Sequence, residues 1–244
     1  MPFFADATQE VLVRRLLLPL LALACLALVT PLMATPAAAD AGVVRVQKRL
    51  NALHCDAGPA DGRFGSHTRS AVIRFQSRHR LSQTGRLGTS TRQALYSSTA
   101  KRCDIRPVPA HSGSGRRIVI SQRQNWIWLV AAGGRVVAQA GIVDNPAVLR
   151  KGTWRTGSYC GRPARVRLNQ SGNVWMDNFV RFAPCGIGFH RIPRSKATGR
   201  QIHANYFLGT NLAGDSHGCV RLSRAMSFKL WDFTAGRRTT VRVL

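Results

Sequence analysis

The sequence contains very few acidic residues. It has 10 Asp and Glu against 36 Lys and Arg, a formal net charge of +26, and Glu10 is the only glutamate among its 244 residues. Lysine is scarce as well, because only five of the basic residues are lysine. A surface so short of negative charge is expected to bind polyanions, which could be nucleic acid, anionic lipid or an anionic cell-wall polymer. The charge alone does not choose among them.

What is absent excludes several classes of protein. With 22 Gly and 11 Pro the chain has too few of either for a fibrous protein, and with 45% hydrophobic residues it is too apolar for a disordered one. Its length allows one or two modest domains. The cysteines form no C-x-x-C pair and the histidines complete no zinc-binding spacing, so we expect no structural metal.

An apolar run lies near the N-terminus. Leu16–Val29 follows Arg14 and Arg15 and precedes the small residues Ala37-Ala38-Ala39. This order predicts a secretory signal peptide over residues 1–39. The alternative is a retained membrane anchor. It is disfavoured because the run holds only about 14 residues, short of the ~20 that a spanning helix needs.

Export would change the meaning of both charge and cysteine. Cleavage removes two basic and two acidic residues, so the exported protein keeps its charge of +26. We therefore expect an anionic polymer of the periplasm or the cell wall as a partner, no nucleic acid, and no membrane span after cleavage. In an oxidising compartment the five remaining cysteines allow two disulfides and one free thiol. They are Cys55, Cys103, Cys160, Cys185 and Cys219.

Residues 40–98 have a helical pattern. Apolar residues recur at helical spacing over residues 43–53, and a turn-rich stretch follows at 55–65. Ser66 is placed to cap a second helix, and a short third helix is expected over residues 89–96. The segment is therefore expected to form a small three-helix bundle.

This bundle resembles the three-helix peptidoglycan-binding domain of many bacterial wall enzymes. The residues that carry the resemblance are Val46, Gln47, Leu50, Asp61-Gly62, Phe64-Gly65, Thr68, Ala71-Val72, Phe75-Gln76, Gly85 and Leu95. A core of about 60 residues is marginal, and a disulfide between Cys55 and Cys103 would brace it. The resemblance implies peptidoglycan binding, although the Asp-Gly turn supports the fold more directly than the binding because such residues also form turns.

The second half of the chain has a β pattern. Residues 99–115 combine Pro, Gly and Ser, which predicts a linker. Beyond it, β-branched and aromatic segments alternate with turn residues, as antiparallel hairpins require. The expected strands are 118–121, 126–131, 136–143, 174–176 and 240–244, with one helix at 223–234. The fold class is therefore multi-domain, a small all-α bundle followed by a mainly β domain over residues 116–244.

Ser216-His217-Gly218-Cys219-Val220-Arg221 is the densest cluster of reactive residue types. A cysteine acts as a nucleophile in its thiolate form, which a nearby imidazole or cation favours. A neighbouring glycine lets a substrate carbonyl approach backbone N–H groups that can hold an oxyanion. Arg221 is able to bind a substrate carboxylate. A buried structural cysteine in a turn is the alternative, but the odd cysteine count favours a reactive thiol.

The cluster closely resembles the catalytic signature of the L,D-transpeptidases, which are cell-wall enzymes with a β-rich catalytic fold. Gly186-Ile187-Gly188-Phe189-His190 and Leu208-Gly209 extend the resemblance upstream, and it runs from Ile118 to Leu244. Two departures affect substrate detail. Arg221 stands where many members have Asn, and residues 153–157 lack the usual Thr-Pro.

The resemblance implies a two-step acyl transfer. Cys219 would attack the carbonyl between residues three and four of a peptidoglycan tetrapeptide stem, releasing the terminal D-residue. An amine of a neighbouring stem would then resolve the thioester to a 3→3 crosslink. Ser216, Gly218, Arg221 and His203 would serve the oxyanion or the substrate. No metal or organic cofactor is needed, and we expect a monomer.

The family's general base is a histidine, and two positions match it. His190 lies in the better-matching Gly-Ile-Gly-Phe-His context, while His203 matches a subgroup with shorter spacing to Ser216. We favour His190, which makes residues 194–215 an extended loop over the cleft. His217 would orient the thiolate or line the oxyanion site. The remaining histidines are expected to be packed or solvated side chains.

Three alternatives stay open from the sequence. Water as acceptor would make the enzyme an L,D-carboxypeptidase. A degenerate second domain would leave a non-catalytic peptidoglycan-binding wall protein, and the charge by itself could mark a protein that only binds polyanions. We also predict a disulfide between Cys160 and Cys185, close to the site, which would brace the strand that carries His190.

Overall fold

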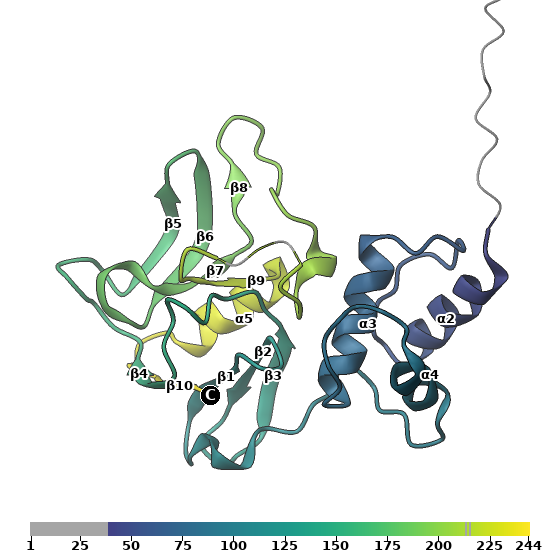
Figure 1. Cartoon of the computed structure of the whole chain (residues 1–244). Coiled ribbons are helices and arrows are strands. Elements are labelled where there is room, and N and C mark those ends of the chain that lie inside the picture. The colour runs from purple at the N-terminus through teal and green to yellow at the C-terminus, as the bar shows by residue number, and fades with distance from the viewer. Residues whose placement is uncertain (1–38, 213, 215) are drawn as a thin grey trace, which may run out of the picture. The chain divides into compact units, whose positions relative to one another are not determined.

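The computed structural model describes residues 39–212, 214 and 216–244, without the side chain of Cys185. Apart from Ala39, the predicted signal peptide lies outside these residues. Ala39–Leu244 form one compact unit. Figure 1 shows its helices α2, α3 and α4 grouped together, and its strands arranged as sheets with α5 against them.

The helical region consists of α2 (Ala41–Ala52), α3 (Ser66–Arg78) and α4 (Thr89–Tyr96). The Asp40 carboxylate caps α2 by accepting hydrogen bonds from the backbone N–H groups of Gly42 and Val43. Our expectation that Ser66 caps α3 is wrong. Gly65 holds the cap position in an extended conformation without a side-chain bond, and Ser66 is the first helical residue.

The buried core of this region is small, and a disulfide and a buried glutamine side chain stabilise it further. Leu50, Phe75 and Leu95 are fully buried in it. The predicted disulfide between Cys55 and Cys103 is confirmed and closes a loop with a sequence separation of 48. The side chain of Gln47 is buried beneath the turn at 61–63 and stabilises that turn through hydrogen bonds.

The side-chain amide of Gln47 forms hydrogen bonds with the polar groups of this turn. Its Nε2 donates to Asp61 Oδ1 at 2.9 Å and to Thr68 Oγ1 at 3.0 Å, and its Oε1 accepts from the Gly62 N–H at 3.0 Å. Gly62 has a φ of 75°, a left-handed conformation that favours glycine. The Asp-Gly turn is therefore held by the fold itself, as its turn chemistry predicts.

The β region contains two five-stranded sheets. The first has the order β3-β2-β1-β10-β4, formed by β1 (Arg117–Ser121), β2 (Trp126–Val130), β3 (Val136–Gly141), β4 (Gly152–Arg155) and β10 (Thr240–Val243). The antiparallel hairpins β1–β2 and β2–β3 are confirmed, whereas β1 and β10 pair in parallel.

The second sheet carries the candidate site. It has the order β5-β6-β7-β9, formed by β5 (Arg165–Ser171), β6 (Val174–Arg181), β7 (Gly188–Arg191) and β9 (Val220–Leu222), and β8 (Arg194–Ser195) pairs with β6. Helix α5 (Arg224–Phe233) begins after Ser223, whose hydroxyl accepts from the Met226 N–H. Apolar residues of both sheets and α5 form one core. Three short 3-10 helices, η1 (Ala110–Ser112), η2 (Pro184–Gly186) and η3 (Asn205–Phe207), lie in the connections.

Arg106 anchors the predicted linker in the interior. It is 1% exposed, donates to the Cys103 and Arg74 carbonyls, and lies 4.0 Å from the centre of the Trp126 ring. Burial, with the neighbouring Arg78 and Arg74, lowers its pKa to about 9. The buried guanidinium of Arg106 therefore fixes the predicted linker to the rest of the protein. Backbone carbonyls and an aromatic ring face hold the guanidinium in place.

The described residues offer neither a membrane-spanning helix nor a cluster of metal-binding side chains. No helix over residues 39–212 and 216–244 combines the length and the apolar character of a membrane span. Within the same ranges no three His, Cys, Asp or Glu side chains gather in a group suited to a metal ion.

Candidate active site

Strand register brings Cys219 and His190 to one face of the second sheet. Val220 on β9 is the parallel partner of Phe189 on β7, and His190 is the partner of Arg221. Successive side chains of a strand alternate between faces. Phe189 and Val220 are fully buried in the core, so His190, Cys219 and Arg221 point to the other face.

That face opens into a cleft of about 700 Å³. Six of the predicted site residues line it: Cys219, His190, His217, Ser216, Arg221 and His203. Its walls come from β5 and β6, the η2 segment, and the chain around Pro193 and Ile202. Part of the predicted loop over residues 194–215 thus borders the cleft.

Gly218 lies behind the cleft rather than in its lining. It is buried with a φ of 118°, and a Cβ at this position would lie 2.7 Å from Val148 Cγ1. Only glycine fits this backbone without strain. Ser216 Oγ accepts a hydrogen bond from the Gly218 N–H at 3.1 Å, and the Ser216 carbonyl accepts from Asn145 Nδ2 at 2.7 Å. These contacts fix the turn that presents Cys219.

Cys219 is a free, partly exposed cysteine. Its Sγ lies 3.4 Å from the Gly186 carbonyl oxygen, to which the thiol donates. Burial raises the pKa of the Cys219 thiol above its ordinary value, and the Gly188 N–H, Arg181 and Arg221 oppose that rise. At neutral pH the resting side chain is therefore a thiol, and ionisation requires a proton acceptor and nearby positive charge.

His190 is buried and held in one tautomer. Its Nδ1 lies 2.6 Å from the Arg191 carbonyl oxygen, which can only accept, so Nδ1 carries the proton and Nε2 has the free lone pair. Burial lowers its pKa to about 4, Arg221 adds to this effect, and the bond to the Arg191 carbonyl opposes it. His190 is therefore a neutral imidazole at physiological pH, ready to accept a proton at Nε2.

The other two histidines of the cleft have less defined surroundings. His203 is partly buried just before η3, and burial, followed by Arg221, lowers its pKa. Within the described chain no hydrogen bond orients its ring, in contrast to His190. His217, two residues before Cys219, is exposed and lines the same cleft. The geometry thus favours His190 over His203 as the base.

Cys160, for which the sequence predicts a disulfide near the site, is disulfide-bonded. The side chain of its predicted partner, Cys185, lies outside the described part, so the pairing stays a prediction. Cys185 is the middle residue of η2, directly ahead of Gly186, whose carbonyl faces the thiol.

Sequence reasoning missed two contributors to the site. Gly186 supplies the carbonyl at the thiol, and Arg181 lines the cleft from the end of β6. One feature of the sequence could have pointed to Arg181: it is a cation inside an otherwise apolar run from Phe179 to Ala183. Phe179 and Ala183 are both buried.

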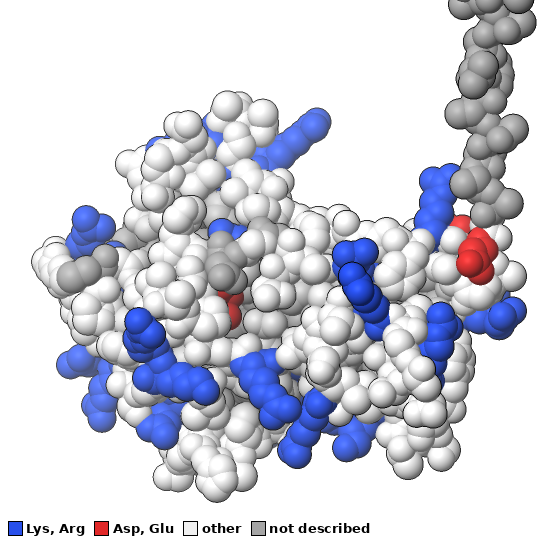
Figure 2. Space-filling model, in the orientation of Figure 1, with Lys and Arg blue, Asp and Glu red and all other residues white. Residues whose placement is uncertain are grey.

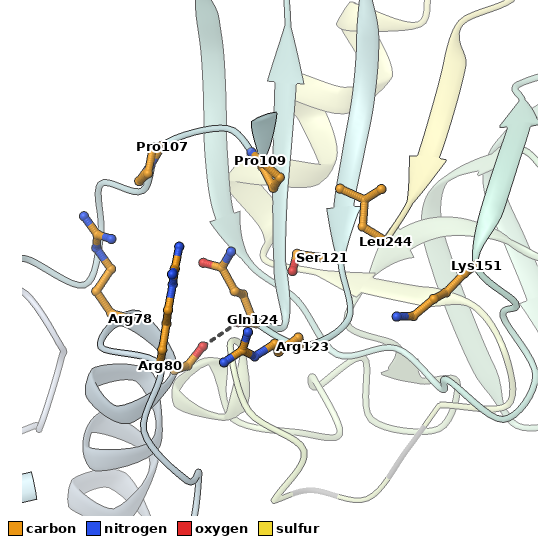
Figure 3. Close-up of a pocket in the computed structure, with 10 residues that line it drawn as sticks. Arg78, Arg80, Pro107, Pro109, Ser121, Arg123, Gln124, Lys151 and Leu244 are labelled. Carbon is orange, nitrogen blue, oxygen red and sulfur yellow. Dashed lines mark hydrogen bonds between the residues drawn. The ribbon is translucent and has the colours of Figure 1, made fainter. Parts of the chain in front are cut away.

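A second pocket, of about 300 Å³, is lined mainly by basic, proline and hydroxyl-bearing residues. Figure 3 shows its basic side chains, Arg78 and Arg80 at the end of α3, Arg123 in the β1–β2 turn, and Lys151 before β4. Thiol, imidazole and carboxylate side chains are absent from its lining. It therefore suits an anion rather than an acyl transfer.

Comparison with known proteins supports this description. Residues 39–95 match the family model PG_binding_1, a peptidoglycan binding domain. The chain is similar to the crystal structure of an L,D-transpeptidase from Xylanimonas cellulosilytica, with 24% identity and a TM-score of 0.50, over 85% of this chain and 95% of that one. The chain has an N-terminal peptidoglycan-binding domain and the L,D-transpeptidase fold.

A second solved structure matches over a similar length. This is an L,D-transpeptidase from Stackebrandtia nassauensis, with 22% identity and a TM-score of 0.41, over 86% of this chain and 97% of that one. No curated protein sequence matches the chain. The mainly β region, predicted from hairpin spacing and from the Cys219 signature, thus has the expected L,D-transpeptidase fold.

Proposed function

We propose that this protein is an exported peptidoglycan L,D-transpeptidase that forms 3→3 crosslinks through Cys219. The observation that carries the proposal is the placement of a free thiol and a neutral, tautomer-fixed imidazole on one face of a sheet, in one cleft. The L,D-transpeptidase fold and the peptidoglycan-binding domain support the substrate class. Fold alone does not define an activity, so the proposal depends on this site.

The first half-reaction uses the neutral pair. His190 Nε2 accepts the Cys219 proton as the sulfur attacks the carbonyl carbon between residues three and four of a tetrapeptide stem. The carbonyl oxygen becomes an oxyanion, for which the backbone N–H groups around Cys219 are the available donors. When the tetrahedral intermediate collapses, the amine of the terminal D-residue leaves with the proton from His190. A thioester remains on Cys219.

The second half-reaction reverses these roles. His190, neutral again, accepts a proton from the amine of a neighbouring stem, and that amine attacks the thioester carbonyl. Cys219 leaves as a thiolate and regains its proton from His190. Because the thiolate supplies the nucleophilicity, the scheme needs no metal or organic cofactor.

Water in place of the amine would make the protein an L,D-carboxypeptidase. A non-catalytic wall-binding protein is the other alternative, and it predicts binding without turnover. Both can be tested by incubating the purified protein with a disaccharide-tetrapeptide and reading the products by mass spectrometry. Loss of the terminal D-residue with formation of dimer supports the transpeptidase, tripeptide without dimer supports the carboxypeptidase, and no turnover by folded protein refutes both.

The choice of base has its own test. His190→Ala is expected to lower turnover by about 10²- to 10⁴-fold, the usual contribution of a general base. His203→Ala is the matched control in the same cleft and is expected to keep most of the activity. The reverse pattern would assign the base to His203.

The basic surface is proposed to hold anionic wall polymers. Figure 2 shows Lys and Arg side chains widely spread over the visible face, with few acidic ones. The pocket of Figure 3 concentrates four cations, and in the described chain none of these four forms a salt bridge. Binding to such polymers should weaken as salt rises, because the cations are near the solvent.

This role can be separated from net charge. A triple variant of the pocket, Arg80→Gln, Arg123→Gln and Lys151→Gln, should bind poly(glycerol phosphate) more weakly than the parent protein. The control neutralises three exposed cations elsewhere, Arg45, Arg135 and Lys229. Equal losses in the two triple variants would mean that total charge, not this pocket, holds the polymer.

A further inference from the structure

Arg181 is a buried cation at the candidate active site with incomplete partners. It is the last residue of β6, is 3% exposed and lines the cleft. Its Nε donates to the Pro163 carbonyl at 3.2 Å, while Nη1 is buried without a hydrogen-bond partner. In the described part of the chain no carboxylate lies within salt-bridge distance of it. A buried guanidinium without a carboxylate partner and with an unpaired N–H group destabilises the fold unless negative charge appears nearby.

Strand register aligns this cation with the thiol. Arg181 on β6 is the partner of Gly188 on β7. Phe189 on β7 is the partner of Val220 on β9, so Gly188 lies beside Cys219, one position earlier on both strands. Arg181, Gly188 and Cys219 therefore form a row across three neighbouring strands. At a strand spacing of ~4.8 Å, the outer two Cα atoms are about 10 Å apart, and the charge of Arg181 is one of those that lower the pKa of the Cys219 thiol.

The middle position of the row has no side chain. A Cβ at Gly188 would lie 2.5 Å from the ring of Phe179, so this position admits only glycine without a shift. The guanidinium of Arg181 lies 4.9 Å from the centre of that ring, which supports it from one side. The space over Gly188 is thus filled by the Phe179 ring of β6, and β7 itself places no side chain between Arg181 and Cys219.

We propose that Arg181 is a positioning residue that stabilises the Cys219 thiolate across Gly188. In the reaction the thiol proton moves to His190 Nε2, the negative charge stays on Sγ, and Arg181 remains protonated throughout. The inference rests on the proposed role of Cys219 as nucleophile.

Its position distinguishes Arg181 from the other cation of the site. Arg221 lies beside His190, and it adds to burial, the larger cause, in lowering the pKa of the imidazole. Arg181 influences the thiol but is not among the groups that shift the pKa of His190. It can therefore favour the thiolate without weakening the base. The charged or titratable groups that face Cys219 across the cleft are Arg162, Arg181, His190, His203, His217 and Arg221.

The test is the pH dependence of alkylation of Cys219 by iodoacetamide, followed on the Cys219 peptide by mass spectrometry. In Arg181→Gln the midpoint should move upward by about 1 pH unit, which makes alkylation below the midpoint about tenfold slower. Arg181→Lys keeps a cation and should restore most of the parent midpoint. Arg135→Gln removes an exposed charge from the β2–β3 turn and should leave the midpoint unchanged.

An unchanged midpoint in a folded Arg181→Gln protein would overturn the proposal, as would an equal shift in Arg135→Gln. If Arg181→Gln does not fold, Arg181→Met serves as a second neutral variant of similar length. Alkylation requires no peptidoglycan, so its outcome is independent of turnover. A tetrapeptide substrate that is never cleaved would refute the proposed function and leave the thiol result standing.

Discussion

Removal of the Cys55–Cys103 disulfide should destabilise the peptidoglycan-binding domain severely. Both sulfur atoms belong to buried residues, at 0% and 1% exposure, so Cys55→Ala/Cys103→Ala is preferable to serine variants that would bury unpaired hydroxyls. For a loop with a sequence separation of 48, the chain-entropy model gives about 4 kcal/mol at 25 °C. A small domain has a total stability of about 5–15 kcal/mol, so this loss removes much of it.

Urea unfolding followed by circular dichroism measures the effect, with binding to sacculi as a functional readout. Cys219→Ala is the matched control, because it removes a sulfur atom but opens no loop, and it should change the stability by less than about 1 kcal/mol. A double variant whose unfolding midpoint equals that of the parent would refute the reasoning, since it would show that the helical core is sufficient without the crosslink.

Two further predictions concern the site. Gly218→Ala should lower turnover at least tenfold, because it adds a Cβ 2.7 Å from Val148 at a φ of 118°. The control Gly199→Ala, at a φ of 67° with open space around it, should leave turnover within about twofold. Equal effects of the two variants would show that the clash with Val148 is unimportant. His190 must be neutral to accept a proton, and burial lowers its pKa to about 4. The value of kcat/KM should therefore stay high as the pH falls through 6.5 and should decline only near pH 4. A decline of kcat/KM that already begins at pH 6.5 or above would contradict this prediction.

Local patterns predicted much of this structure. Apolar spacing, helix-start residues and turn residues located the three helices and the β1–β2–β3 hairpins, because each depends on residues close in sequence. The signature around Cys219 and the match at His190 located the candidate nucleophile and base, since the chemistry requires those residue types. The turn at Asp61-Gly62 was predicted for the same local reason.

Long-range pairing was beyond the reach of local patterns. The parallel partners β1 with β10, and β7 with β9, are far apart in sequence, and only the folded chain shows which residues face each other. Arg181 is an example, because its relation to Cys219 depends on two register pairs across three strands. Strand β5 was also missed, since most of its residues are polar and its side chains are largely exposed.

The central claim is that Cys219 is the nucleophile of an acyl transfer. The most direct test is intact-protein mass spectrometry after mixing with a disaccharide-tetrapeptide in the absence of an acceptor stem. The account predicts a covalent adduct with the mass of the substrate minus its terminal D-residue, located on Cys219 by peptide mapping and absent from Cys219→Ala. An adduct on another residue, or hydrolysis that proceeds equally in Cys219→Ala, would contradict it.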